Sequence, residues 1–394
     1  MKKTIRDYDL AGKRVLIRVD FNVPLDGSKV LDDSRIKASI KTISYAIENG
    51  AKVILLSHLG RVKNECDKTK YNLKYVVSSL EKNLGKSVLF SEQTRGNELE
   101  EMVLRMHSGD VLLVQNTRYE DVPNNLESGC DEDLGKYWAS LGDIFINDAF
   151  GTSHRRHASN VGVASNIPNG IGFLVEDEIN TFNKLMTSEA RPFTVILGGS
   201  KVSDKIEVIN SLVLKADYIL IGGGMAYTFL YASGINVGSS LLDLEHVPFC
   251  RDILKKYQNK IILPIDSVVS KSIDGKMDSH TCFINEIKSD EIGVDIGYNT
   301  VKLFKQYLNL SKTILWNGPV GIFEVDSFNK GTIGILDALK DIDALKVSGG
   351  GDTTSAIERF GYHDAFTHIS TGGGATLELL EGRILPGIEV IDEK

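Results

Sequence analysis

Cysteine is scarce in this chain, and its spacing excludes the usual cysteine-based frameworks. The 394 residues include only Cys66, Cys130, Cys250 and Cys282, which lie far apart and form no CxxC pair. Disulfide-stapled folds and the common zinc modules depend on closely spaced cysteines. We therefore expect four free thiols, neither a disulfide framework nor a zinc site, and a reducing compartment.

Long apolar runs are missing as well. No run approaches the ~18 residues that a membrane-spanning helix needs, and the opening MKKTIRDYDL has two lysines without an apolar segment behind them. The sequence therefore predicts no membrane partner and no signal peptide, and we expect a cytoplasmic protein. The net charge of −8 argues against general nucleic-acid binding, although it does not exclude a local basic cleft.

The length and the pattern of apolar runs indicate two α/β domains. A chain of 394 residues is too long for one core, because single cores stop growing near about 250–300 residues. Short, wholly apolar runs alternate with helical patterns, which predicts parallel sheets covered by helices on both faces. The expected strands are residues 15–19, 53–57, 87–90, 110–115, 143–147, 193–198, 218–222, 260–265, 313–317, 345–348 and 367–370.

The segment SNIPNGIGFLVEDEINTFNKLM marks the expected domain boundary. Pro168 and two glycines precede an acidic helical pattern, as in a helix that links two domains. We expect a first domain over residues 1–170, a linking helix and hinge over 171–186, and a second domain over 187–380. The tail, from about residue 381 to 394, is expected to return to the first domain.

Strands of the first half end in charged or polar side chains. Ligands of open parallel sheets bind at the carboxyl ends of strands, and arginine matches the oxygens of phosphate and carboxylate groups. A single arginine is more often a surface ion pair, but several at matching strand ends predict a site for a small anion. These residues are Arg18, Asp20, Asn22, Arg35, His58, Arg61, Arg118, His154 and Arg155. His154 and His157 lack a third metal ligand nearby, so we expect them to be structural or anion-facing.

Strands of the second half end in glycine. Glycine lets the backbone approach a ligand closely, and a helix that begins after such a turn presents N–H groups to phosphate. One such turn is as often a plain helix cap, whereas several together predict a nucleotide site. The second half lacks both GxxxxGK[ST] and GxGxxG, so it is no P-loop and a dinucleotide site is disfavoured. The glycine turns are residues 198–199, 222–224, 349–351 and 372–374.

Two motifs of the second half have competing interpretations. Asp352 and Thr353 could cap a helix, or Asp352 could hold magnesium. Lys201 and Lys205 would share one helical face, either beside an anion or as a solvated surface.

In WNGPVGIFE, the chain must turn at Pro319, because proline cannot continue the strand ladder. Asn317 and Glu324 could bond a ribose or a base there, or the segment could be a plain tight turn. Trp316 could simply be a core residue.

Seven motifs, in order along the chain, resemble those of the phosphoglycerate kinase family. They are RVDFNVP (18–24), SHLGR (57–61), NDAFGTSHRRHAS (147–159), GGSKVSDKI (198–206), WNGPVGIFE (316–324), GGGDT (349–353) and STGGGA (370–375). The resemblance runs from near residue 4 to the end of the chain. It departs from the family pattern at Val62, Gln115, Tyr298 and Val320, none of which belongs to the implied site.

The resemblance implies two Rossmann-like parallel-sheet α/β/α domains, joined by a linking helix and bilobal with a central cleft. Phosphoglycerate would bind the N-terminal domain, and ATP or ADP with Mg²⁺ the C-terminal one. Carried over by position, the substrate-binding residues are Asp20, Phe21, Asn22, Arg35, His58, Leu59, Gly60, Arg61, Arg118 and Arg155. The nucleotide-binding residues are Gly199, Lys201, Lys205, Gly223, Gly293, Asn317, Pro319, Glu324, Gly350, Gly351, Asp352 and Thr353, with Asp352 as the metal ligand. Those expected to be catalytic are Arg35, Lys201, Lys205, Gly350 and Gly351.

The reaction so implied is reversible phosphoryl transfer between 1,3-bisphosphoglycerate and ADP, giving 3-phosphoglycerate and ATP, a step of glycolysis and gluconeogenesis. In reverse, the attacking carboxylate is already ionised at pH 7, so no general base is needed. Substrates on separate domains imply closure by hinge bending. The partners would be these small molecules, and we expect a monomer.

Two alternatives remain open from the residues. One is another carboxylate phosphotransferase built on a similar plan. The other is a non-catalytic two-domain protein that binds a nucleotide.

Overall fold

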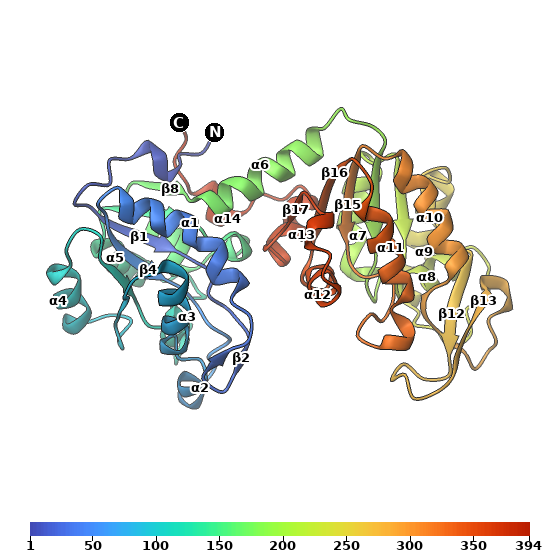
Figure 1. The fold of residues 1–394 in the computed structure, drawn as a ribbon, viewed down its shortest axis with the longest axis horizontal. Coiled ribbons are helices and arrows are strands. Elements are labelled where there is room, and N and C mark those ends of the chain that lie inside the picture. Colours follow the sequence, from blue (N-terminus) through green and yellow to red (C-terminus); the bar gives the residue numbers. More distant parts are fainter. The chain divides into compact units, whose positions relative to one another are not determined.

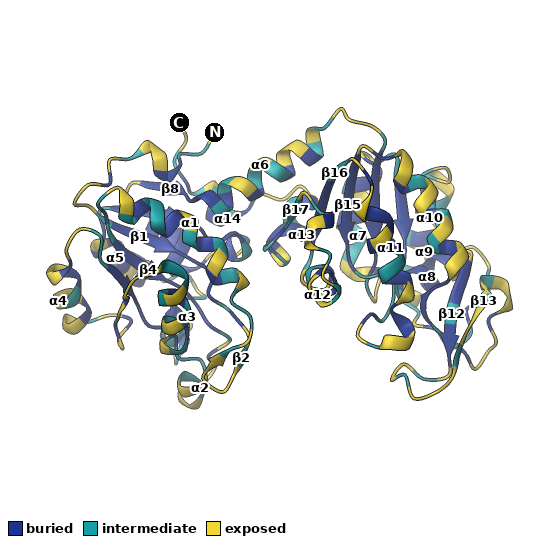
Figure 2. Cartoon of the chain, in the orientation of Figure 1, coloured by how far each residue is buried: buried dark blue, intermediate teal, exposed yellow.

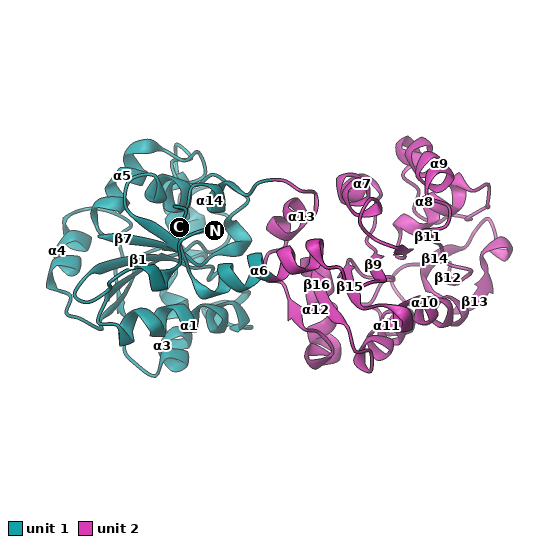
Figure 3. Cartoon of the chain, turned by 90° about the horizontal axis from the view of Figure 1, so that it is seen from above, with its two compact units in different colours: residues 1–180, 384–394 teal, residues 181–383 magenta.

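The computed structural model describes residues 1–394, which divide into two compact units (Figure 3). Unit 1 comprises residues 1–180 and 384–394, and unit 2 comprises residues 181–383. The division falls inside helix α6 (Phe173–Thr187), at the expected linking segment. The C-terminal tail pairs with the start of the chain in unit 1, where the N–H of Lys3 donates to the carbonyl oxygen of Asp392 at 2.8 Å.

Unit 1 is built on a six-stranded sheet in the order β5-β6-β4-β1-β7-β8, with every neighbouring pair parallel. Figure 3 shows α1 and α3 on one side of this sheet and α5 and α14 on the other. The strands are β1 (Arg14–Arg18), β4 (Lys52–Leu56), β5 (Leu89–Phe90), β6 (Val111–Leu113), β7 (Ile144–Asn147) and β8 (Asn169–Ile171), beside a small hairpin of β2 (Leu25–Asp26) and β3 (Lys29–Val30). The helices are α1 (Ser34–Glu48), α2 (Glu65–Lys70), α3 (Lys74–Leu84), α4 (Asn97–Arg105), α5 (Glu132–Ser140) and α14 (Pro386–Glu389).

Unit 2 is built on a second six-stranded parallel sheet, in the order β11-β10-β9-β15-β16-β17 (Figure 1). A separate antiparallel sheet has the order β13-β12-β14. The strands are β9 (Phe193–Leu197), β10 (Tyr218–Ile221), β11 (Ile261–Ile262), β12 (Asp266–Ser270), β13 (Ser279–Phe283), β14 (Ile292–Ile296), β15 (Thr313–Asn317), β16 (Leu345–Gly349) and β17 (His368–Ile369). The helices are α7 (Ile206–Val213), α8 (Met225–Ala232), α9 (Val247–Lys256), α10 (Tyr298–Leu310), α11 (Lys330–Lys340), α12 (Gly351–Phe360) and α13 (Gly374–Leu380).

The central strands of both sheets are buried, apart from the first residue of β1 and of β4, which is partly exposed (Figure 2). Every residue of β9 and β15 is buried, because helices cover both faces of the sheet. Trp316 on β15 is fully buried, and its Nε1–H donates to the carbonyl oxygen of Gly318 at 2.7 Å, so it is a core residue. The prediction of two parallel-sheet α/β units is confirmed, and each expected strand has a counterpart. No helix is long and apolar enough to cross a membrane.

The antiparallel sheet was not predicted from the sequence. Strand β13 carries no buried residue, and β12 reads DSVVS, in which polar side chains are buried beside valines. Neither strand is an apolar run, so the pattern that identifies the parallel strands does not identify these.

Candidate functional site

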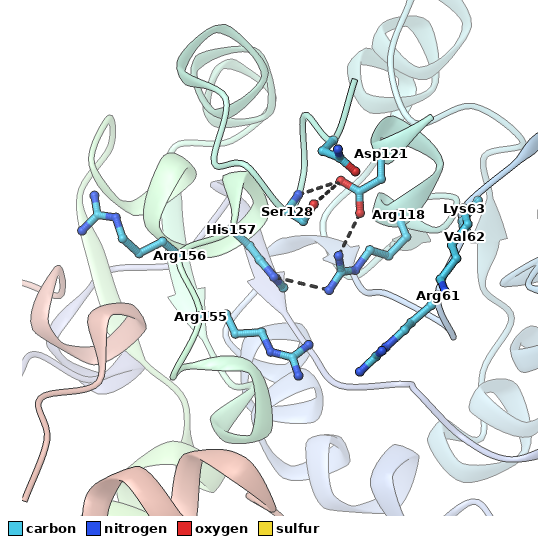
Figure 4. A pocket seen from close by; sticks show the side chains of 10 residues that line it. Arg61, Val62, Lys63, Arg118, Asp121, Ser128, Arg155, Arg156 and His157 are labelled. Carbon is cyan, nitrogen blue, oxygen red and sulfur yellow. Dashed lines mark hydrogen bonds and ion pairs between the residues drawn. The ribbon is translucent and has the colours of Figure 1, made fainter. Parts of the chain in front are cut away.

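Unit 1 contains a cavity of about 540 Å³, here called the arginine cavity. Its lining residues are Arg61, Val62, Lys63, Arg118, Asp121, Asn125, Ser128, Arg155, Arg156 and His157. Arg61 follows β4, Arg118 follows β6 and Arg155 follows β7, so the parallel sheet delivers them to one edge. Figure 4 shows the guanidinium groups of these three arginines turned toward a shared space, whereas that of Arg156 points away. Three of the predicted anion-binding residues therefore converge.

The guanidinium group of Arg118 is held in place by two neighbouring side chains. Its Nη1 donates to Asp121 Oδ2 at 2.8 Å, and its Nη2 lies 3.4 Å from His157 Nε2. Asp121 is itself fixed by the N–H and hydroxyl of Ser128, at 2.7 and 2.9 Å from Oδ1. An arginine with one edge paired in this way presents its remaining N–H groups in a fixed direction.

A second group of predicted residues forms a chain of polar contacts. Arg35 Nη1 donates to Asp20 Oδ2 at 2.9 Å, and His58 Nδ1 lies 3.8 Å from Asp20 Oδ1. Arg18 Nη2 lies 3.4 Å from the same ring nitrogen of His58. The structure therefore links Asp20, Arg35 and His58 directly, with the buried Arg18 beneath them.

Both buried histidines of this region are held neutral. Burial, followed by the charges of nearby arginines, lowers the pKa of His157 to about 2 and lowers that of His58 well below its usual range. The guanidinium groups of Arg18, Arg118 and Arg155 act on both rings. Several cations gathered in one region, as here, are the arrangement expected of an anion site.

Phe21 and Leu59, also carried over to the site, have structural roles in this region. Both side chains are buried in the core. Their backbone N–H groups are used internally, since Phe21 donates to Ser57 Oγ at 2.9 Å and Leu59 donates to Asn116 Oδ1 at 3.1 Å. They position the loops that carry their charged neighbours, and their direct contact with a substrate stays a prediction.

Asn22 and Gly60 join these loops. Gly60 donates its N–H to Asn22 Oδ1 at 2.8 Å. A Cβ on Gly60 would lie 2.3 Å from the ring of Tyr71, so glycine is required there for packing.

Sequence reasoning missed the residues that support the anion site. Glu127 is fully buried and accepts from both the N–H and the hydroxyl of Ser159, while Arg18 Nε donates to the same hydroxyl at 2.8 Å. Nothing in its local sequence marks Glu127, because its partners lie elsewhere in the chain. Asp121 had a usable signal, because it stands three residues after Arg118.

Unit 2 has two pockets at the glycine-bearing strand ends, and both are lined by Asp352. The larger pocket, of about 450 Å³, is lined by Gly199, Ser200, Gly223, Gly224, Tyr227, Ser239, Leu241, Ile273, Ile292, Gly293, Val294, Asp295, Pro319, Val320, Gly321, Ile322, Glu324 and Asp352. The smaller pocket, of about 220 Å³, is lined by Lys205, Asn317, Gly318, Gly350, Gly351, Asp352, Thr353, Gly373, Gly374 and Leu377. Among the nucleotide-binding residues expected, only Lys201 lines neither pocket. The apolar wall formed by Tyr227, Leu241, Ile273 and Ile292 was not predicted.

Lys205 and Asn317 form one side of the smaller pocket. Lys205 Nζ donates to Asn317 Oδ1, and Asn317 Nδ2 donates to the carbonyl oxygen of Gly349 at 2.9 Å. Burial lowers the pKa of Lys205, while Asp204 and Asp352 oppose the shift. Asn317 is fully buried, and its amide bonds Lys205 and Gly349, so it positions the lysine. The expected bond from its side chain to a ribose or base stays a prediction.

The first turn of α12 forms the opposite side of this pocket. The N–H groups of Gly351, Asp352 and Thr353 have no acceptor within the helix, as in any first helical turn. The expected side-chain cap is wrong, because Gly350 is the N-cap and neither Asp352 nor Thr353 caps it. Thr353 Oγ1 instead accepts from the N–H of Gly318 at 2.7 Å, which ties two loops together.

Lys201 and Lys205 do not share a helical face. Helix α7 begins only at Ile206, and Lys201 lies exposed in the preceding loop. Lys205 ends a short 3-10 helix, Ser203–Lys205. The loop before that helix is tied to its neighbours, because the N–H of Gly199 donates to Pro319 and that of Met225 donates to Gly199. The predicted spacing argument for these two lysines is therefore wrong, although both remain at the same strand end.

Asp352 fits the role of a magnesium ligand. Its carboxylate is exposed, makes no helix-capping bond and lines both pockets. Mg²⁺ beside nucleotides usually has one or two carboxylate ligands and otherwise phosphate oxygens and water. One free carboxylate beside a helix N-terminus meets that requirement.

Comparisons with known proteins agree with this geometry. The family model described as phosphoglycerate kinase matches residues 5–383. The chain is 54% identical to phosphoglycerate kinase of Enterococcus faecalis and 50% identical to that of Fusobacterium nucleatum, with 100% of each chain covered. It superimposes on the structure of phosphoglycerate kinase from Coxiella burnetii with a TM-score of 0.89 at 34% identity, covering 99% of this chain and 98% of that one. For the enzyme from Pyrococcus horikoshii the TM-score is 0.87 at 32% identity, with the same coverage. The chain belongs to the phosphoglycerate kinase family.

Proposed function

We propose that the two units divide the ligands of the phosphoglycerate kinase reaction between them. The chain is a phosphotransferase with a carboxyl group as acceptor, and it transfers phosphoryl reversibly between 1,3-bisphosphoglycerate and ADP. Unit 1 binds the phosphoglycerate in the arginine cavity, and unit 2 binds ATP or ADP in its two pockets. The observation that carries the proposal is the convergence of three arginines, following three different strands, on one cavity.

In unit 1, Arg61, Arg118 and Arg155 hold the 3-phosphate, whose oxygens match guanidinium groups. His58 and the Asp20–Arg35 pair lie along the same edge of the sheet. A neutral His58 can accept or donate one hydrogen bond without adding charge.

In unit 2, the N–H groups at the start of α12 bind nucleotide phosphate, and Lys205 adds a positive charge beside them. The apolar wall of the larger pocket accommodates the base, and the exposed Glu324 is available to the ribose. Asp352 would hold Mg²⁺, which when bound neutralises phosphate charge.

Transfer then depends on positioning and on charge neutralisation. The attacking carboxylate is already ionised at neutral pH, so no residue has to remove a proton. We assign Arg35 and Lys201 to the charge that develops on the transferring group. Lys201 has an exposed side chain at the end of β9, free to reach a ligand.

Binding calorimetry on two variants tests the division. Arg118→Ala is expected to weaken 3-phosphoglycerate binding and leave ATP binding unchanged, and Lys205→Ala is expected to do the reverse. If either variant lost both ligands while keeping the thermal stability of the parent, the assignment of one ligand to each unit would be wrong.

A further inference from the structure

A cluster of metal-binding side chains lies in unit 2, apart from the residues assigned to the reaction. One ligand atom from each of His280, Cys282 and Glu291 lies within 4.8 Å of the others. His280 and Cys282 belong to β13, and Glu291 immediately precedes β14. The expectation of no zinc site rests on the absence of a CxxC pair. This set has a single cysteine, and its third member, Glu291, lies just before a different strand.

The antiparallel sheet explains how these three side chains meet. In the register of the sheet, His280 pairs with Val269 and Cys282 with Ser267. Residues two apart on a strand share a face, so His280 and Cys282 point the same way. On the far side of β12, Val269 pairs with Gly293, two residues after Glu291. Glu291, two residues from Gly293, therefore lies on the same face, and its carboxylate comes within 4.8 Å of the ligand atoms of both β13 side chains.

The geometry is close to what a tetrahedral ion requires. Zinc bonds of about 2.0–2.3 Å place neighbouring ligand atoms roughly 3.3–3.7 Å apart in a tetrahedron. His280 Nε2 and Glu291 Oε1 are already 3.6 Å apart. The carboxylate is 4% exposed and is fixed by the N–H of Lys288, which donates to Oε2 at 3.0 Å, so one oxygen remains for another partner.

The neighbouring charges favour a cation here. The carboxylates of Glu291, Glu286 and Asp266 act on the Cys282 thiol with negative charge, which favours a cation there, whereas Lys288 opposes them. Lys288 Nζ lies 3.6 Å from Glu291 Oε1, but its side chain is 71% exposed and can turn into solvent. A metal ion would replace the thiol proton, which passes to water as the sulfur–metal bond forms.

The donor set identifies the class of metal. Thiolate sulfur, imidazole nitrogen and one carboxylate oxygen are all common zinc ligands, whereas Mg²⁺ and Ca²⁺ prefer oxygen alone. We propose that His280, Cys282 and Glu291 bind one Zn²⁺ ion, with a water molecule as fourth ligand.

A bound ion would stabilise one wall of the larger pocket of unit 2. The ion would bridge the edge strand β13 to the start of β14, whose residues Ile292, Gly293 and Val294 line that pocket. The inference does not depend on the proposed function, because a structural ion needs no part in phosphoryl transfer.

Cobalt substitution tests the proposal without an activity assay. The metal-free full chain is titrated with Co²⁺, and we expect one equivalent to produce a thiolate-to-cobalt charge-transfer band that Zn²⁺ then abolishes. Cys282→Ser should remove the band, and His280→Gln should weaken Co²⁺ binding by at least about 100-fold, since outer-shell partners alone cost 10–100-fold. Cys66→Ser removes an exposed thiol of unit 1 and is the matched control, which should leave the titration unchanged.

Two results would overturn the inference. One is the absence of a thiolate band in the parent chain at saturating Co²⁺. The other is Co²⁺ binding of equal strength in the parent, Cys282→Ser and His280→Gln, which would indicate adventitious surface binding. His280 is 54% exposed on an edge strand, so its substitution is not expected to unfold the unit. Zn²⁺ should also raise the Tm of the parent and not that of Cys282→Ser.

Discussion

Arg155 and Arg156 are neighbours in the chain whose side chains point in different directions. Figure 4 shows the guanidinium group of Arg155 turned toward those of Arg61 and Arg118, and that of Arg156 turned away. Both residues line the arginine cavity, so composition alone does not separate them. The directions of their side chains do distinguish them, so Arg155 and Arg156 form a matched pair for testing the anion site.

We predict that Arg155→Ala weakens 3-phosphoglycerate binding by about 2–5 kcal/mol, the range for truncating one partner of a charge pair, here one that the bound ligand would bury. Arg156→Ala should change it far less, because its side chain does not face the same space. Isothermal titration calorimetry measures both, with ATP binding as a reference that neither change should alter. Normal 3-phosphoglycerate binding by Arg155→Ala would remove that residue from the site.

Lys201 is predicted to matter in the transition state. Its exposed side chain follows β9, and Lys201→Ala should lower kcat by about 10²–10⁴, the order expected when a preorganised electrostatic contact is lost. Lys312→Ala is the control, since that exposed lysine precedes β15, at the opposite end of the sheet. Steady-state kinetics decides: a rise in KM at constant kcat would show uniform ligand binding and exclude the assigned role.

The glycines of unit 2 show what residue patterns can predict. A Cβ on Gly198 would lie 2.0 Å from the carbonyl oxygen of Pro319, and one on Gly223 would lie 2.7 Å from that of Gly199. These positions are glycine because loops pack against each other. Around Gly351, by contrast, no atom lies within 4 Å of such a Cβ, so backbone there is open to a ligand. The glycine pattern predicts a nucleotide site at these strand ends. It does not distinguish glycines that loop packing requires from glycines that leave the backbone open to a ligand.

At the scale of elements, the start of α6 is held by the buried carboxyl group of Asp148, the residue that follows β7. Asp148 Oδ1 accepts the N–H of Leu174 at 3.0 Å, within the first turn of α6. The same carboxyl group fills the space beside Gly172, where a Cβ would lie 2.1 Å from Oδ1. Burial raises the pKa of Asp148 to about 8, although backbone N–H groups of α6 partly oppose the shift.

This residue makes stability depend on pH in a definite direction. Between the ordinary aspartate pKa and about 8, the folded chain binds a proton at Asp148 that the unfolded chain does not. Its contribution to stability therefore falls as pH rises through that window, by roughly 1.4 kcal/mol per pH unit. Asp148→Asn removes the titration, so its unfolding free energy relative to the parent should increase from pH 5 to pH 8. Denaturant unfolding at several pH values measures the difference, and a flat or falling difference would contradict the buried, protonated state.

Elements with a strong periodic signal could be predicted, and those fixed by tertiary contacts could not. Both central sheets followed from apolar runs, because strands covered on two faces have few polar residues. The antiparallel sheet and the late start of α7 did not, since side-chain pairing and backbone bonds between loops determine them. The candidate site followed the same rule: Arg61, Arg118 and Arg155 could be found, whereas Glu127 and Tyr227 act through distant partners.

At the scale of the whole molecule, we predict that the proposed division of ligands between the units is accompanied by their closure on binding. In-line transfer needs reacting atoms within about 3–3.5 Å, and contacts between domains of one chain are usually modest. We predict that 3-phosphoglycerate and ATP with Mg²⁺ together give a more compact form than either alone, by bending near Gly170, Gly172 and α6. Small-angle scattering measures the radius of gyration in each state. An unchanged radius in the ternary complex, with activity intact, would exclude the hinge.

The central claim is that the chain transfers phosphoryl from ATP to the carboxylate of 3-phosphoglycerate. The phosphoglycerate would bind in the arginine cavity and the ATP in the two pockets of unit 2. The most direct measurement is ATP consumption by the purified chain with Mg²⁺ and either 3-phosphoglycerate or acetate, in parallel with Arg118→Ala. We predict turnover with 3-phosphoglycerate, none with acetate, and a large loss in the variant. Equal turnover with acetate, or ATP binding without turnover on 3-phosphoglycerate, would contradict the claim.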